Sequence, residues 1–208
     1  MLFSMGYLRE ARGAAQAWFA RDPENSTNAN SLMVLHESLG DTQSSDRMYQ
    51  TGLELYETWN AGHHGRLVAL MGRVRQAQAD PAVVTRGFRQ GPMPPFRAQL
   101  AARFDDREAV VAFLRGALEE FTGPFTATDI ATFAAYFQEP DVALEAVRNG
   151  SSRFAITLVW LWTPLFKDVR QLEQFKQHMR EIGMVDAWRE LGWPDLCEPT
   201  GGDDFRCD

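Results

Sequence analysis

Two glycines 34 residues apart, Gly6 and Gly40, constrain the fold of this chain more than any other feature. Each falls between two stretches with helical periodicity, and similar residues follow both at the same offsets. The positions after Gly6 are Ala11, Ala15, Trp18 and Phe19, and those after Gly40 are Ser45, Tyr49, Gly52 and Leu53. A helix-turn-helix unit of this length cannot bury its apolar face alone and must stack on its neighbours. The spacing therefore predicts an array of helical hairpins.

Helical patterns with short turns continue along the chain. Predicted helices cover residues 7–21, 26–39, 41–59, 106–120, 127–137, 140–148 and 152–162, and Val169, Leu172, Phe175, Met179 and Ile182 line one face of another that ends at Gly183. We expect an all-α protein, a right-handed α-solenoid of about twelve helices without a sheet of consequence. The solenoid spans residues 1–194, with a possible joint at 91–95, and residues 195–208 form a flexible acidic tail.

The first two units resemble the tetratricopeptide repeat. The matching residues are Gly6, Ala11, Ala15, Trp18, Phe19, Asp22 and Pro23 in the first unit, and Leu32, Gly40, Asp41, Ser45, Tyr49, Gly52 and Leu53 in the second. Met33 and Gly52 depart from the family pattern, and the match decays past residue 60. The resemblance implies a non-catalytic scaffold that binds a protein or peptide.

The first unit is incomplete by the family pattern. Five residues precede Gly6, where a helix of about 14 residues would fit. We therefore expect Met1 to lie inside a repeat and the natural protein to continue upstream.

The end of the chain suggests a second function. Trp188-x-x-x-Gly192-Trp193-Pro194, followed by Gly201-Gly202-Asp203-Asp204-Phe205, is similar to the C-terminal end of bacterial multidomain proteins. In those proteins a tetratricopeptide region follows an adenylate/guanylate cyclase domain or a winged-helix DNA-binding domain. The alternative function is therefore a sensory module that controls an upstream effector domain, which this chain does not contain.

The binding face follows from the resemblance. The first helix of each hairpin lines the groove, which implies Asn30, Val34 and Glu37 from one hairpin and His64 and Val68 from the next. Residues 61–120 carry nine basic and six acidic residues within a chain of net charge −7. With Arg66 and Arg73 near the groove, the partner is expected to be acidic or phosphorylated, while solvated surface arginines remain the alternative. The overall negative charge argues against nucleic acid.

No catalytic or metal-binding pattern stands out. His63 and His64 are adjacent, so their side chains diverge on a helix and do not converge on a metal ion. There is no phosphate-binding glycine loop and no nucleophile elbow, and the sequence after Gly201 lacks the α/β context of a nucleotide cyclase. We expect no enzyme activity, no cofactor and no metal.

Cys197 and Cys207 are the two cysteines of the chain, and two states are open to them. They are free thiols in a reducing cytosol, or a disulfide in an oxidising periplasm. The compartment is equally open: cytoplasmic for a complete chain, periplasmic for the sensor half of a membrane-anchored protein. The longest apolar stretch, residues 154–162, is too short to span a bilayer.

Overall fold

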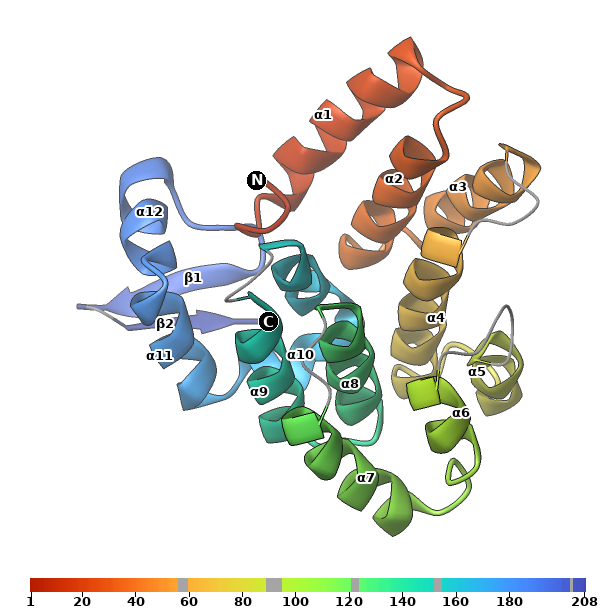
Figure 1. The fold of residues 1–208 in the computed structure, drawn as a ribbon. Helices are drawn as coiled ribbons and strands as arrows, with labels where there is room; N and C mark the ends of the chain where they lie inside the picture. The colour runs from red at the N-terminus through yellow and green to blue at the C-terminus, as the bar shows by residue number, and fades with distance from the viewer. Residues whose placement is uncertain (56–59, 89–94, 121–123, 152–154, 203) are drawn as a thin grey trace.

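A computed structural model describes residues 1–55, 60–88, 95–120, 124–151, 155–202 and 204–208. Within these residues the chain is almost wholly helical, with twelve α-helices, two 3-10 segments and one two-stranded hairpin (Figure 1). The all-α prediction is confirmed. No helix in the described residues is long and apolar enough to cross a bilayer. Of the joint predicted at 91–95, residues 91–94 lie outside the described residues, and Pro95 begins a helix.

The first half contains helices α1 to α5, with the bounds Leu8–Arg21, Ser26–Ser38, Thr42–Leu55, Asn60–Arg75 and Pro81–Phe88. Asn25 caps α2 by accepting a hydrogen bond from the backbone N–H of Thr27. Gly40 ends the same helix in the left-handed region, at φ 78°. Gly6 adopts a similar φ of 87°, so both glycines occupy the turn positions expected from their spacing.

The second half contains α6 to α9, with the bounds Pro95–Ala101, Arg107–Glu120, Pro124–Tyr136 and Pro140–Ser151. The carboxylate of Asp106 caps α7 by accepting from the N–H of Ala109 at 3.0 Å. Helices α8 and α9 pack as an antiparallel hairpin, as α2 and α3 do (Figure 1). The core joins both halves, because buried residues from nearly every helix form one continuous cluster.

Two predicted helices near the end of the chain differ from the expectation. Residues 152–162 were expected to form an α-helix, but the described part, Ala155–Trp162, is the 3-10 segment η1. The helix expected through residues 169–182 is split into α10, Lys167–Arg170, and α11, Glu173–Glu181, after the short 3-10 segment η2, Pro164–Phe166. Leu172 has extended backbone between the two helices, and the side chains of Arg170 and Gln171 hold the C-terminal strand there.

The flexible tail expected at 195–208 is instead an ordered β-hairpin. After α12, Met184–Leu191, strand β1, Cys197–Gly201, pairs antiparallel with β2, Asp204–Cys207. Side chains alternate along β2, so Phe205 and Cys207 face inward. Phe205 is fully buried, and its ring lies 5.4 Å from Trp188 and 5.6 Å from Trp193. These aromatic contacts hold the hairpin against the helical body.

The two ends of the chain lie together. Tyr7 donates a hydrogen bond from its hydroxyl to the carbonyl of Gly192, and the N–H of Asp195 donates to the carbonyl of Gly6. In the middle, α4 packs against η2 and α8, which follow it by many residues (Figure 1). The helices thus curl back on themselves. The coarse prediction of stacked helical hairpins fits this arrangement, whereas an extended array with its ends apart does not.

Candidate functional site

Five residues from successive first helices of the hairpins meet in the middle of the molecule. His64 of α4 follows Asn30 of α2 by 34 residues, and Arg97 of α6 and Asp129 of α8 follow at intervals of 33 and 32. Trp160 of η1 completes the set. We call these five residues the repeat row: Asn30, His64, Arg97, Asp129 and Trp160. They occupy equivalent positions of consecutive units, spaced by nearly one repeat period.

Asp129 is the electrostatic centre of the repeat row. Arg97 binds its carboxylate with two hydrogen bonds, from Nε at 2.9 Å and from Nη2 at 2.7 Å. The Nδ1 atom of His64 lies 3.2 Å from the same carboxylate. Burial alone raises the pKa of Asp129, but hydrogen bonds and charge from His64 and Arg97 outweigh it and hold the pKa below its ordinary value. Asp129 is therefore an anion fixed between two partners.

The ring of His64 has one committed edge and one uncommitted edge. Nδ1 lies 3.0 Å from Nη2 of Arg97 as well as close to Asp129, so it donates to the carboxylate or accepts from the guanidinium according to its tautomer. The ring packs edge-on against Trp160, with centroids 4.9 Å apart. Its Nε2 atom is buried and has no hydrogen-bond partner in the part of the chain that the structure describes. That nitrogen is free to bind a ligand in either tautomer.

Asn30 holds a second uncommitted polar atom beside α4. Its Oδ1 is buried and unpartnered within the described residues. Helix α4 reaches α2 closely here because residue 65 is a glycine: a Cβ at Gly65 would lie 2.9 Å from Oδ1 of Asn30 and 2.7 Å from Cε of Met33. A buried polar atom without a partner costs roughly 1–3 kcal/mol, which a ligand hydrogen bond recovers. Asn30 and His64 therefore supply hydrogen-bonding capacity on one shared face.

The arginines expected to face an acidic partner are already paired inside the protein. Arg73 forms a two-pronged ion pair with Glu37, with Nε to Oε1 at 3.0 Å and Nη2 to Oε2 at 2.6 Å. Its Nη1 also donates to Asp46 at 3.1 Å. Arg66 binds Asp46 as well, and its guanidinium lies 4.8 Å above the ring of Tyr49. These groups cross-link α2, α3 and α4.

The remaining predicted residues fall in the core or in the repeat row. Val34 and Val68 are 4 % and 1 % exposed, so their side chains pack inside the protein and do not line an open groove. Glu37 is also buried, by its contact with Arg73. The structure thus brings all seven predicted residues to the contact between α2 and α4, namely Asn30, Val34, Glu37, His64, Arg66, Val68 and Arg73. Asn30 and His64 are the two that retain unpaired polar atoms.

Sequence reasoning missed the partners of His64. Arg97, Asp129 and Trp160 carried no motif, but their spacing of nearly one repeat from each other was a usable signal. It was obscured because the residue type changes at every repeat and the intervals shorten along the chain. The ion pair of Glu37 with Arg73, 36 residues apart, also follows from the stacking of α2 on α4.

Metal and catalytic chemistry find little support in this geometry. Among the described residues no three His, Cys, Asp or Glu side chains gather as metal ligands. A surface depression of about 500 Å³ lies along α3, but the residues that line it all come from that helix, Gln43, Asp46, Arg47, Met48, Gln50, Thr51 and Glu54. It contains no convergent buried polar group comparable to the repeat row.

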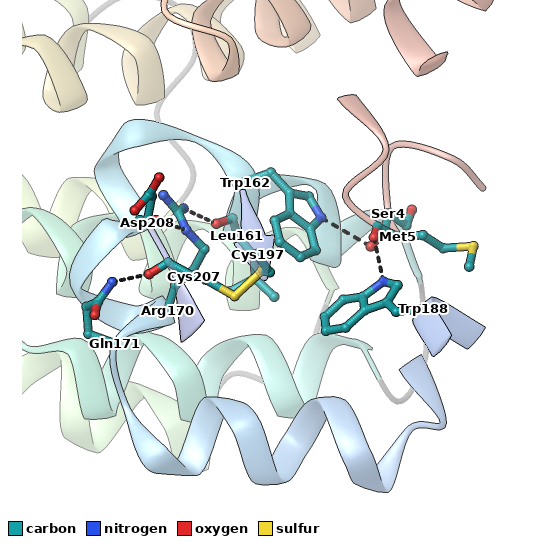
Figure 2. The surroundings of a disulfide bond; sticks show 10 residues. All are labelled: Ser4, Met5, Leu161, Trp162, Arg170, Gln171, Trp188, Cys197, Cys207 and Asp208. Carbon is teal, nitrogen blue, oxygen red and sulfur yellow. Dashed lines mark hydrogen bonds between the residues drawn. A yellow bond between two sulfur atoms is a disulfide. The ribbon is translucent and has the colours of Figure 1, made fainter. Parts of the chain in front are cut away.

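A disulfide between Cys197 and Cys207 lies at a second junction, where the two ends of the chain meet (Figure 2). Gln171 donates to the carbonyl of Cys207, and Arg170 donates from Nε to the carbonyl of Asp208 at 2.7 Å. Arg170 also binds backbone carbonyls of the preceding 3-10 segment and its turn, and burial lowers its pKa to about 10. The C-terminal strand is thus tied to the body through its backbone.

Tryptophans connect this junction to the N-terminal turn. Figure 2 shows the indole N–H of Trp162 donating to the carbonyl of Ser4 and that of Trp188 donating to the carbonyl of Met5, at 3.2 and 2.9 Å. Asp195 adds an ion pair with Arg9 at 2.8 Å. The first nine residues therefore rest on the same structure that carries the disulfide.

Comparison of the chain with family models, with curated proteins and with solved structures gives no match in any of the three. The geometry described above therefore carries the functional argument.

Proposed function

We propose that this protein is a non-catalytic binding module, built from tetratricopeptide-like hairpins in a right-handed array, that holds a protein or peptide segment. The observation that carries the proposal is the repeat row. Equivalent positions of successive first helices converge on one face, as expected when stacked hairpins line a shared concave surface. Asn30 and His64 lie on that face with unpaired polar atoms.

The geometry favours a ligand bound by hydrogen bonds over one bound by charge. The guanidinium groups of Arg66 and Arg73 are occupied by Asp46 and Glu37, so neither supplies a free positive charge for an acidic or phosphorylated segment. Asn30 and His64 are each partly exposed as residues, although the unpaired atoms lie below the surface. A segment laid across α2 and α4 reaches those atoms after a small side-chain movement, and its backbone N–H and C=O groups match them chemically.

A peptide-display selection tests the proposal. The whole chain is used to select binders from a random peptide library, and purified peptides are then measured by fluorescence anisotropy. Asn30→Ala removes the amide from the repeat row and should weaken binding about tenfold, as expected for loss of one well-placed hydrogen bond. The matched control is Asn28→Ala on the exposed side of the same helix. Equal affinities for both variants, or selection of no peptide, would contradict the proposal.

A second function, a sensory module that controls an attached effector domain, is favoured by the junction of the chain ends. A change at the disulfide hairpin has a direct route to residues 1–9, through Trp188 and Asp195. Hydrogen exchange of the amides at residues 4–9 tests this, measured before and after reduction of the disulfide. Faster exchange there supports the sensory function, and unchanged exchange in a fully reduced sample argues against it.

A further inference from the structure

Helix α1 has one buried face and one open face. Leu8, Ala11 and Ala15 are buried, and α1 packs mainly against α2. On the other side Trp18 is 60 % exposed, one of the most exposed large apolar side chains among the described residues. A Cβ built at Gly13 meets no atom within 4 Å. Figure 1 places α1 at the margin of the molecule.

The internal repeat shows what this face lacks. One repeat later, in α3, the position of Trp18 is taken by Gly52, which is buried. Helix α3 packs against α2 on one side and contacts α4 on the other, so it has a helix on each flank. The face of α1 that includes Trp18 corresponds to a face that another helix covers in α3. The fold thus provides the geometry of an occupied version of the same surface.

The exposed face is one continuous stripe. Its members recur at i, i+3, i+4, i+7, i+8 and i+11, which places them along one side of a helix, and they are Glu10, Gly13, Ala14, Ala17, Trp18 and Arg21. Glu10 lies near one end of the stripe and Arg21 at the other. Neither forms an ion pair with the described part of the chain, so both charges are available to a partner.

We propose that this face, called here the α1 face, binds the α1 face of a second copy of the chain, with the two helices antiparallel. An antiparallel pair centred between Ala14 and Ala17 sets Glu10 of each copy opposite Arg21 of the other. The same register sets each Trp18 opposite Gly13 of the other copy, where the absence of a side chain leaves room for the indole. Ala14 then faces Ala17, so the two backbones approach closely. A two-fold dimer uses the same patch twice, and this stripe is complementary to itself in charge and in shape.

The size of the α1 face predicts a weak dimer. Helix α1 has 14 residues and is therefore about 21 Å long. A single helix pair of this length buries less than the roughly 1,200 Å² of a standard stable interface. We expect dissociation in the micromolar range, with monomer predominating at low concentration.

Charge exchange tests both the surface and the register. Sedimentation velocity of the whole chain, across micromolar to submillimolar concentration, gives the dimer dissociation constant. Glu10→Arg and Arg21→Glu should each weaken the dimer about tenfold, because each sets like charges opposite one another at both ends of the pair. The double variant, Glu10→Arg with Arg21→Glu, restores opposite charges in the antiparallel register and should recover the original constant. Trp18→Ala should weaken the dimer at least tenfold.

Gly13→Leu provides an independent check. The new side chain fills the space assigned to the indole of the second copy, so the dimer should weaken while the isolated helix becomes more favourable. Circular dichroism melting of each variant confirms that the monomer remains folded, since all the substituted residues are exposed. A monomer at every concentration, or a double charge variant that stays as weak as the single ones, would overturn the proposal.

Discussion

Removing the carboxylate of Glu37 should destabilise this protein strongly, because it leaves a buried arginine without its main partner. The side chains of Glu37 and Arg73 are 2 % and 9 % exposed, and two hydrogen bonds join them. Loss of one member of a buried ion pair typically costs about 3–5 kcal/mol. Asp46 stays 3.1 Å from Nη1 of Arg73 and compensates in part, which places Glu37→Ala near 3 kcal/mol.

The predicted cost comes from the stranded charge and can be separated from the packing of the two side chains. The double variant Glu37→Leu with Arg73→Met replaces the pair by apolar residues of similar volume, and it should lie within about 1 kcal/mol of the natural protein. Arg115→Ala removes an exposed partner of Glu139 and serves as a control, with an expected effect below about 1 kcal/mol.

Urea unfolding followed by circular dichroism measures these differences. With an m-value of about 2 kcal/mol per M, a loss of 3 kcal/mol lowers the midpoint by about 1.5 M. A Glu37→Ala midpoint within about 0.3 M of the natural protein would show that Arg73 is not held in a buried pair. A double variant as unstable as the single one would refute the role assigned to the stranded charge.

Three further predictions concern turns, the disulfide and pH. Gly40→Ala should cost about 1 kcal/mol for its left-handed backbone, and Gly6→Ala should cost more, because its Cβ would also lie 2.9 Å from the ring of Trp162; thermal unfolding of both variants gives the comparison. Replacing both cysteines by serine opens a loop of 10 residues and should lower the free energy of unfolding by about 2–3 kcal/mol in urea titrations, and equal stability would contradict it. Burial lowers the pKa of His36 and of His178 below the ordinary 6.5, so the unfolded state takes up protons first on acidification; stability should be complete above about pH 6.5 and fall below it, and replacing both histidines by glutamine should flatten that step.

The first half of the fold was largely predictable from local sequence. Gly6 and Gly40 adopt the positive φ angles that their place between helices required. Helices α1 to α3 begin within a few residues of the expected positions, because caps and apolar periodicity are local signals. The contact between α2 and α4 also follows from the repeat spacing.

The C-terminal part was less predictable because its structure depends on distant contacts. The hairpin of residues 197–207 reads as a polar, glycine-containing tail, yet Phe205 is buried against aromatic rings of α11 and α12 and of the following turn. Similarly, Leu172 fits a helical pattern, but the chain is extended there while Arg170 and Gln171 bind the last strand. Local periodicity carries no information about such partners.

The candidate site was predicted in position but not in its chemistry. Asn30 and His64 were expected on the inner face, and the structure places them beside each other's helices. The charge state of the face could not be read from sequence, because a free arginine and one paired with a residue 36 positions away look identical. The acidic ligand was inferred from unpaired Arg66 and Arg73, and the ion pairs remove that basis.

A nuclear magnetic resonance titration with a selected peptide tests the central claim most directly. Side-chain amide signals of asparagine and ring signals of histidine report on Asn30 and His64 individually, without any substitution. The account predicts that peptide addition shifts both signals in a saturable manner, with smaller changes at Arg97 and Asp129 around the same centre. Saturable binding that leaves Asn30 and His64 unchanged, and shifts signals elsewhere on the molecule, would contradict it.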